Sequence, residues 1–119
     1  ITFRQPSTGN PVRDQMAVLI YPTTGESPAA APVLHWSRDP DSPGILQCRV
    51  VTPEGEDLHF FSDGTQRDFG PVSGAFHYAC LRLRDGKPRW ISTTGATRLD
   101  IGNRNLLQTG SPTDREWPL

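Results

Sequence analysis

Short runs of hydrophobic residues alternate along this chain with turns rich in proline and glycine, and each run has the length of a β-strand. In the run Ile45–Thr52, the side chains of Leu46, Cys48 and Val50 fall on one face, which is the period of two that strands require. No part of the chain has a convincing helical period. The pattern predicts strands at Ile1–Gln5, Gln15–Tyr21, Val33–Ser37, Ile45–Thr52, Asp57–Ser62, Ala75–Arg84, Lys87–Thr93 and Thr97–Ile101.

Two connections between these runs are typical of β-hairpins. The sequence Pro-Glu-Gly-Glu at 53–56 is a tight turn between two predicted strands. Asp85 and Gly86 supply the positive φ angles of a type I′ turn, which makes the second hairpin the more distinctive one. The run Ala75–Arg84 is apolar on both faces, so we expect it to be a central strand of its sheet.

The number and spacing of the runs predict the fold class. Seven or eight short strands without a helix indicate an all-β protein, an antiparallel β-sandwich or β-barrel of about 7–8 short strands. Asn103–Gln108 fits either one helical turn or a strand, and residues 111–119 resemble a polar tail. A chain of 119 residues can bury its own core, so we expect a single β domain over 1–119. Because it begins at Ile1 without a signal peptide, we expect it to be a fragment of a longer protein.

Composition and charge narrow the classes of partner. Twelve Lys and Arg residues stand against 13 Asp and Glu residues, which gives a net charge of -1 and no basic excess with which to neutralise phosphates. No stretch approaches the roughly 18 apolar residues of a membrane-spanning helix. We therefore expect neither nucleic acid nor membrane as a partner.

Residue types that carry catalysis occur only singly. The chain has no Gly-x-Ser-x-Gly turn, and both Cys48 and Cys80 fall in apolar runs, where a thiol is unreactive. The sequence therefore predicts no enzymatic activity.

One loop places two carboxylates close together. Asp39 and Asp41 are one residue apart, which makes them the candidates for a metal, and calcium is the one cofactor that they suggest. The three histidines lack the spacing of zinc ligands, and the sequence favours a loop cap or an exposed turn over a calcium site for the acidic pair. Without that calcium site, we expect no cofactor and no metal.

Four segments carry a resemblance to a known family, and they are Val33-Leu34-His35-Trp36, Asp39-Pro40-Asp41-Ser42, Pro53-Glu54-Gly55 and Pro71-Val72-Ser73-Gly74-Ala75-Phe76. From Val33 to about Thr94, the chain resembles the C-terminal part of calicivirus protruding domains, and its length is more similar to the small protruding domains of nodavirus-like capsids. The resemblance implies a non-enzymatic β-rich spike on the virion surface of a small icosahedral RNA virus. Such a spike associates as a dimer or trimer and attaches to a host-cell receptor or glycan.

Recognition residues on rigid β scaffolds concentrate in loops. For a protein of this kind we therefore expect the contacts to a partner among the charged residues of the predicted loops. These are Arg38, Asp39, Asp41, Asp63, Arg67 and Asp85.

Two alternatives remain open at the level of sequence. Cys48, and Cys80 two residues after Tyr78, are similar to the strand cysteines of an immunoglobulin-like adhesion or receptor module. That alternative implies a Cys48–Cys80 disulfide and a secreted or extracellular protein, whereas a capsid protein assembled in the cytosol would keep both thiols free. The second alternative is a small carbohydrate-binding β domain, in which some of the three tryptophans would stack on sugars.

Overall fold

The computed structural model describes residues 2–4, 15–17, 32–38, 41–42 and 44–119, and the chain divides into two compact units, Ile1–Ala31 and Pro32–Leu119. In the first unit, strand β1 (Thr2–Arg4) pairs antiparallel with β2 (Gln15–Ala17). Both strands fall inside runs that the hydrophobic pattern predicts. That one domain spans 1–119 stays a prediction, because most of the first unit lies outside the described residues.

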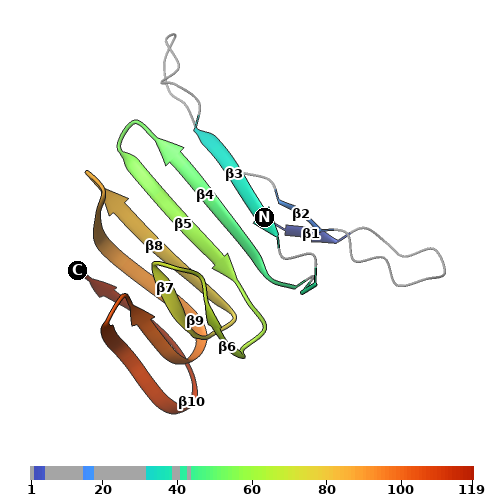
Figure 1. Cartoon of the computed structure of the whole chain (residues 1–119), viewed down its shortest axis with the longest axis vertical. Coiled ribbons are helices and arrows are strands. Elements are labelled where there is room, and N and C mark those ends of the chain that lie inside the picture. The colour runs from blue at the N-terminus through green and yellow to red at the C-terminus, as the bar shows by residue number, and fades with distance from the viewer. Residues whose placement is uncertain (1, 5–14, 18–31, 39–40, 43) are drawn as a thin grey trace, which may run out of the picture. The chain divides into compact units, whose positions relative to one another are not determined.

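The second unit is one curled antiparallel sheet of eight strands (Figure 1). Along its main path the order is β3-β4-β5-β8-β9-β7-β6, and β10 pairs with the other edge of β9. The described residues contain no helix, so the predicted all-β class is confirmed, in the form of a partly closed barrel. The strands are β3 (Val33–Arg38), β4 (Leu46–Thr52), β5 (Gly55–Phe61), β6 (Gln66–Asp68), β7 (Val72–Ala75), β8 (Tyr78–Arg84), β9 (Lys87–Ile101) and β10 (Arg104–Pro118).

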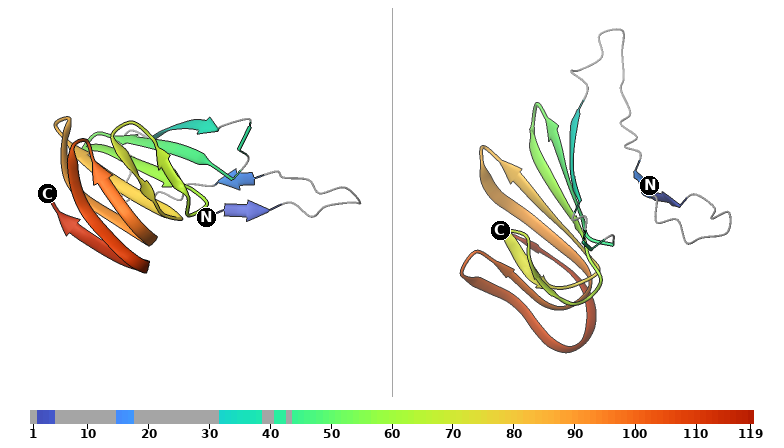
Figure 2. Two further views of the ribbon diagram at one scale, coloured as in Figure 1. Left: turned by 60° about the horizontal axis from the view of Figure 1, so that its bottom comes forward. Right: turned by 45° about the vertical axis from the view of Figure 1, so that its right-hand side comes forward.

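The long strand β9 gives the sheet its curl. Its first part pairs with β8 as far as Thr94, and its last part, from Arg98, pairs with β7 on the same edge. Gly95, between the two parts, has a φ of 64°, a conformation that glycine adopts at no steric cost. The sheet bends here into two wings that face each other (Figure 2). The first wing is β3, β4, β5 and β8 with the start of β9, and the second wing is β6 and β7 with its end.

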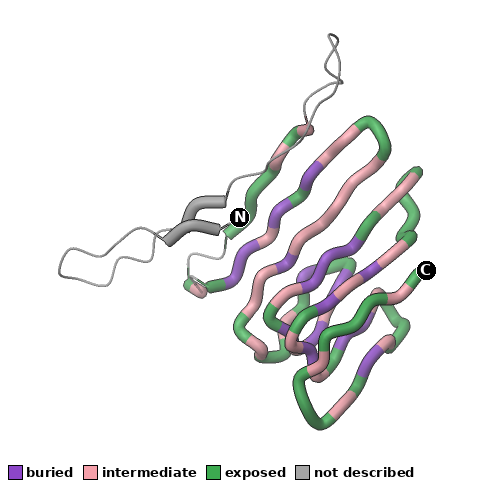
Figure 3. The backbone as a smooth tube through the Cα atoms, turned by 180° about the vertical axis from the view of Figure 1, so that it is seen from behind, coloured by how far each residue is buried: buried purple, intermediate pink, exposed green. Residues whose placement is uncertain are grey.

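The hydrophobic core lies between the two wings. Phe60 of the first wing packs on Phe69 of the second, with ring centroids 5.2 Å apart, and Phe69 packs on Phe76 at 5.6 Å. Buried positions occupy the strands, and the hairpin tips are exposed (Figure 3). The core comprises Ile45, Phe60, Phe69, Val72, Phe76, Ala79, Leu81, Ile91, Ala96, Leu99 and Leu107.

The predicted central strand Ala75–Arg84 is interrupted in the structure. β7 ends at Ala75 and β8 begins at Tyr78, and between them Phe76 enters the core while His77 is exposed. The interruption lies beside the bend of β9, and the backbone N–H of His77 still donates to the carbonyl of Thr94 at 3.1 Å. The prediction that this segment is central is confirmed, because β8 lies between β5 and β9.

The expected polar tail at 111–119 is wrong, because this segment completes β10. Glu116 lies opposite Ser92, and Trp117 lies opposite Ile91. Trp117 packs against the core, and the guanidinium of Arg115 lies 5.2 Å from the centroid of its ring. The pairing with β9 supplies the order here, because the polar sequence of the segment has little strand propensity of its own.

Candidate functional site

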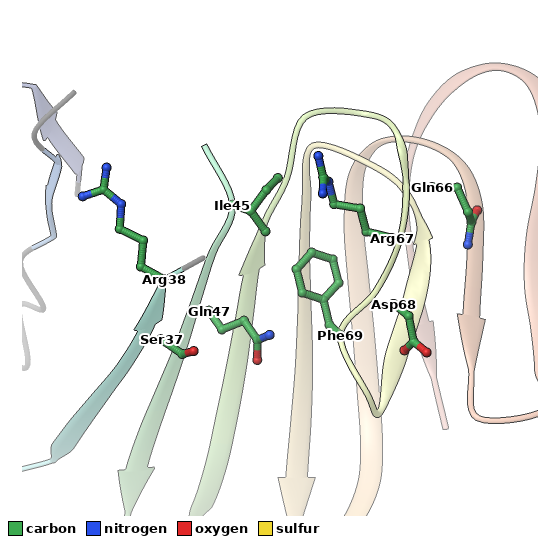
Figure 4. A pocket seen from close by; sticks show the side chains of 8 residues that line it. All are labelled: Ser37, Arg38, Ile45, Gln47, Gln66, Arg67, Asp68 and Phe69. Atoms are coloured by element: carbon green, nitrogen blue, oxygen red, sulfur yellow. The ribbon is translucent and has the colours of Figure 1, made fainter. Parts of the chain in front are cut away.

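The curl brings the two end strands of the main path, β3 and β6, to opposite sides of one hollow (Figure 4). This hollow, which we call the seam pocket, has a volume of about 370 Å³. Its lining is mostly polar, with buried Ile45 and Phe69 between the polar side chains. The seam pocket is lined by Ser37, Arg38, Ile45, Gln47, Gln66, Arg67, Asp68 and Phe69.

The register of the sheet explains how these side chains meet. Arg38 is the last residue of β3, and Ser37 beside it lies opposite Gln47 of β4. On the other side of the pocket, Arg67 of β6 lies opposite Gly74 of β7. The backbone N–H of Phe69 donates to the carbonyl of Val72 at 2.9 Å, which forms the tight turn after β6. The pocket is therefore built from backbone that the sheet holds in place.

Arg67 is held in one orientation by Asp63. Its Nε and Nη2 atoms donate to the two carboxylate oxygens of Asp63 at 3.3 and 3.0 Å, and Thr65 donates to the same carboxylate from its hydroxyl at 2.6 Å and its backbone N–H at 3.1 Å. The hydrogen bonds from Arg67 first, and then those from Thr65, hold the pKa of Asp63 well below its usual range. Exposed ion pairs add little stability, so we interpret this one as positioning the guanidinium at the rim of the pocket.

A second, more apolar hollow adjoins the seam pocket. It has a volume of about 220 Å³, and Leu58, Phe60 and Pro71 are among the residues that line it. Ser37 and Gln47 line both hollows, so the two adjoin and are treated together as one cleft. We call it the seam cleft. It has a polar mouth at one end of the sheet and an apolar floor over the core face of β5.

The seam cleft offers groups that suit the binding of a ligand. Its hydroxyl, amide and guanidinium groups donate and accept hydrogen bonds, and its apolar floor can cover a hydrophobic surface. The seam pocket has no cysteine and no histidine among its lining residues, whereas the second hollow has His35 and Cys48, and burial raises the pKa of the Cys48 thiol. Within the described residues there is also no group of three or more His, Cys, Asp or Glu side chains placed to hold a metal ion.

The structure brings together half of the predicted contact residues. Arg38 and Arg67 line the seam pocket, and Asp63 holds Arg67. Asp41 is exposed in the turn that joins β3 to β4, at the same end of the sheet. Asp85 lies at the opposite end, at the tip of the β8–β9 hairpin.

Asp39 lies outside the described residues, so the calcium site at Asp39 and Asp41 stays a prediction. The sequence analysis missed Gln47, Gln66 and Asp68. Only Gln47 has a usable signal, because it alternates with the apolar residues of β4 and must face the opposite side of the sheet from them.

The two cysteines lie on the outer face of the first wing, opposite to the core face. His59 of β5 lies between them, opposite Cys48 of β4 on one side and Cys80 of β8 on the other. Two strand spacings, roughly 10 Å, separate the cysteines, which exceeds the reach of a disulfide. Both are free and buried, so the bridge that the immunoglobulin-like alternative implies is not formed.

Burial also keeps both thiols unreactive. It raises the pKa of Cys48, and it raises the pKa of Cys80 to about 11, so each thiol stays protonated at neutral pH. The same desolvation lowers the pKa of His59 and keeps its imidazole neutral. We interpret Cys48, His59 and Cys80, which lie side by side on three neighbouring strands, as part of the packing of the sheet.

Comparison with known proteins adds no relative, because no protein-family profile, curated protein or solved structure matches this chain. The part of the chain that the structure describes has no helix long and apolar enough to cross a membrane. The inference of function therefore depends on the residues of the seam cleft and on the resemblance in the sequence.

Proposed function

We propose that this chain is the protruding domain of a small icosahedral RNA-virus capsid protein, and that it attaches to a host-cell glycan through the seam cleft. It acts at the virion surface as a homo-oligomer and has no enzymatic activity. The observation that carries the proposal is the polar pocket that Ser37 of β3 and Arg67 of β6, from strands far apart in the sequence, line together.

The balance of groups in the seam pocket favours a glycan over a strongly charged ligand. Gln47 and Gln66 offer amide donors and acceptors, which suit vicinal hydroxyl groups. The cationic charge of Arg38 and Arg67 is offset by Asp63 and Asp68. The apolar floor of the cleft suits the C–H face of a sugar ring or an acyl substituent.

The resemblance in the sequence points to the same part of the molecule. The segment Val33-Leu34-His35-Trp36 is most of β3, which borders the seam. The segment that begins at Pro71 contributes to the apolar floor and then forms β7. In this proposal, the residues that resemble protruding domains therefore build the cleft that binds the receptor.

A glycan array tests the proposal directly. We expect the purified chain to bind a subset of glycans, and Gln66→Ala and Arg67→Ala to weaken that binding at least tenfold. Asp85→Ala is the matched control, because it removes a charged side chain at the opposite end of the sheet and should bind as the wild-type chain does. Binding to cells should fall after glycosidase treatment of the cells.

Three results would contradict the proposal. The first is an array on which no glycan binds. The second is binding that the Gln66 and Arg67 variants leave unchanged. The third is hydrolysis or transfer of a bound glycan, which would make the chain an enzyme.

A further inference from the structure

Strand β3 presents an open edge. It pairs with β4 along one side and with no other strand among the described residues. An edge of this kind exposes a row of backbone N–H and C=O groups that can pair with another strand. In the described part of the chain, the exposed large hydrophobic side chains are Val33 at 51% and Trp36 at 43%, and both belong to β3.

Within the described residues, the other open edges of the sheet have protective features and β3 has none. β6 has only three residues. The free side of β10 is interrupted by shifts of register, and the strand contains Pro112 and several charged residues. These are the devices by which natural sheets prevent edge-to-edge pairing. β3 has six residues in unbroken register with β4, and it contains no proline and no lysine.

We propose that β3 pairs antiparallel with β3 of a second copy of this chain, which joins two curled sheets into one continuous sheet. Antiparallel edges match one another about a two-fold axis, so the same surface serves on both subunits. This inference is argued from the open edge of β3, a strand that also borders the seam cleft, because Ser37 and Arg38 line the seam pocket and Trp36 lines the second hollow. It gives the proposed homo-oligomer a defined surface and a defined number of subunits.

The side chains of β3 select the register. In one continuous sheet, the core faces of the two subunits must lie on the same side. Because side chains alternate between the faces of a strand, a residue of one β3 must then lie opposite a residue of the partner's β3 whose number differs from its own by an even number. One such register places Trp36 opposite Trp36 of the partner subunit, and Arg38 opposite Leu34 of the partner subunit. This register covers both indoles and opposes no like charges. The neighbouring register would place His35 opposite His35 of the partner subunit and leave the indoles apart.

A single pair of strands with one aromatic pair is smaller than a standard interface. We therefore expect a concentration-dependent dimer, with a dissociation constant on the order of 10 µM. Sedimentation velocity of the full chain over a range of concentrations measures it. Trp36→Lys should weaken the dimer at least tenfold, because it removes the indole and opposes two cations across the axis. Gln108→Lys is the matched control, since it places the same charge on the exposed side of another edge strand, β10, and should leave association unchanged.

Disulfide cross-linking tests the register separately from the affinity. Directly opposite residues of antiparallel strands lie within reach of a disulfide. Under mild oxidation, Trp36→Cys should therefore form a covalent dimer and His35→Cys should not. The native cysteines do not interfere, because both are buried.

Several results would overturn the inference. One is a chain that stays monomeric at all concentrations. A monomer in which hydrogen exchange shows that another segment of the same chain protects the backbone of β3 would overturn it in the same way. Another is a dimer that Trp36→Lys leaves intact, or one that cross-links through His35→Cys. Glycan binding by the wild-type chain is measured independently of its oligomeric state. A monomer that binds a glycan therefore refutes only the dimer, and a dimer that binds none refutes only the attachment function.

Discussion

The hydroxyl of Tyr78 lies 2.7 Å from Nδ1 of His59, on the outer face of the first wing. The two rings are stacked, with centroids 6.0 Å apart, and both side chains are half-buried. Burial first, and then the neighbouring Cys80, raises the pKa of Tyr78, whereas burial lowers the pKa of His59. Both rings are therefore neutral at pH 7, and the hydrogen bond joins two uncharged groups.

This arrangement predicts a stability that falls on both sides of neutral pH. Burial raises the pKa of Cys80 from 9.0 to about 11, so the folded state keeps a proton that the unfolded state loses. The free energy of unfolding should therefore fall between pH 9 and 11, by about 2 kcal/mol from this group. The pKa of His59 is lowered, so the unfolded state binds the extra proton on the acid side, and stability should fall as the pH drops below 6.5.

Urea denaturation at a series of pH values measures both limbs of this profile. Cys80→Ala should reduce the alkaline limb to the part that Tyr78 contributes, because the pKa of Tyr78 is raised as well, and should leave the acid limb in place. His59→Gln should reduce the acid limb and leave the alkaline limb in place. An alkaline limb that is unchanged in the Cys80 variant would show that the buried thiol does not cause it.

The positions of the two cysteines predict their reactivity. Cys48 and Cys80 should both be titrated by a thiol reagent in denaturant without reductant, which gives two thiols per chain. In the folded protein both should react slowly, because each is buried and protonated. Fewer than two thiols in the denatured chain would indicate an oxidised cysteine and contradict the structure.

Packing between the wings predicts a large effect of one substitution. Phe76 is completely buried beside Phe69, so Phe76→Ala should destabilise the fold by about 3–5 kcal/mol. Val33→Ala is the control, because that side chain is half-exposed and should cost less than about 1 kcal/mol. The two free energies of unfolding come from urea titration. Equal effects would mean that the wings do not share one core.

A close approach of two strands predicts the effect of an added methyl group. Gly74 of β7 has a φ of 155°, and a Cβ atom there would meet the backbone carbonyl oxygen of Arg98 on β9. Gly74→Ala should therefore separate β7 from β9 and destabilise the second wing by roughly 2 kcal/mol or more. Gly110→Ala, at an exposed position with no atom within 4 Å, should change stability by less than about 0.5 kcal/mol in the same thermal or urea unfolding measurement.

Much of the strand pattern can be predicted from the sequence because local signals determine it. The Asp85-Gly86 turn and the alternation of Leu46, Cys48 and Val50 are confirmed. The alternation does not say which face meets the core, and in the structure these three residues lie on the outer face of the first wing. β6 is too short for a periodic signal, and the end of β10 is ordered by pairing with β9.

The candidate site could be predicted only in part, because the curl of the sheet creates it. Arg38 and Arg67 are plausible contact residues from their place in predicted loops, but no local pattern indicates that they share a pocket. The pocket that β3 and β6 share depends on the bend at Gly95, where the sequence indicates a break between two strands and the structure has one continuous strand. The residues of β6 line the pocket only because the bend brings β6 close to β3.

Strand β9 runs through both wings, and this has a consequence for the way the second unit opens. Separating the wings would expose the core that they share and would disrupt the pairing of β9 with β10, which extends past the bend on both sides. The amides of β8, β9 and β7 should therefore exchange with solvent together, through one global opening event and not through separate local ones. A protease should meet either the intact sheet or the fully unfolded chain, so partial digests should contain no stable half of this unit.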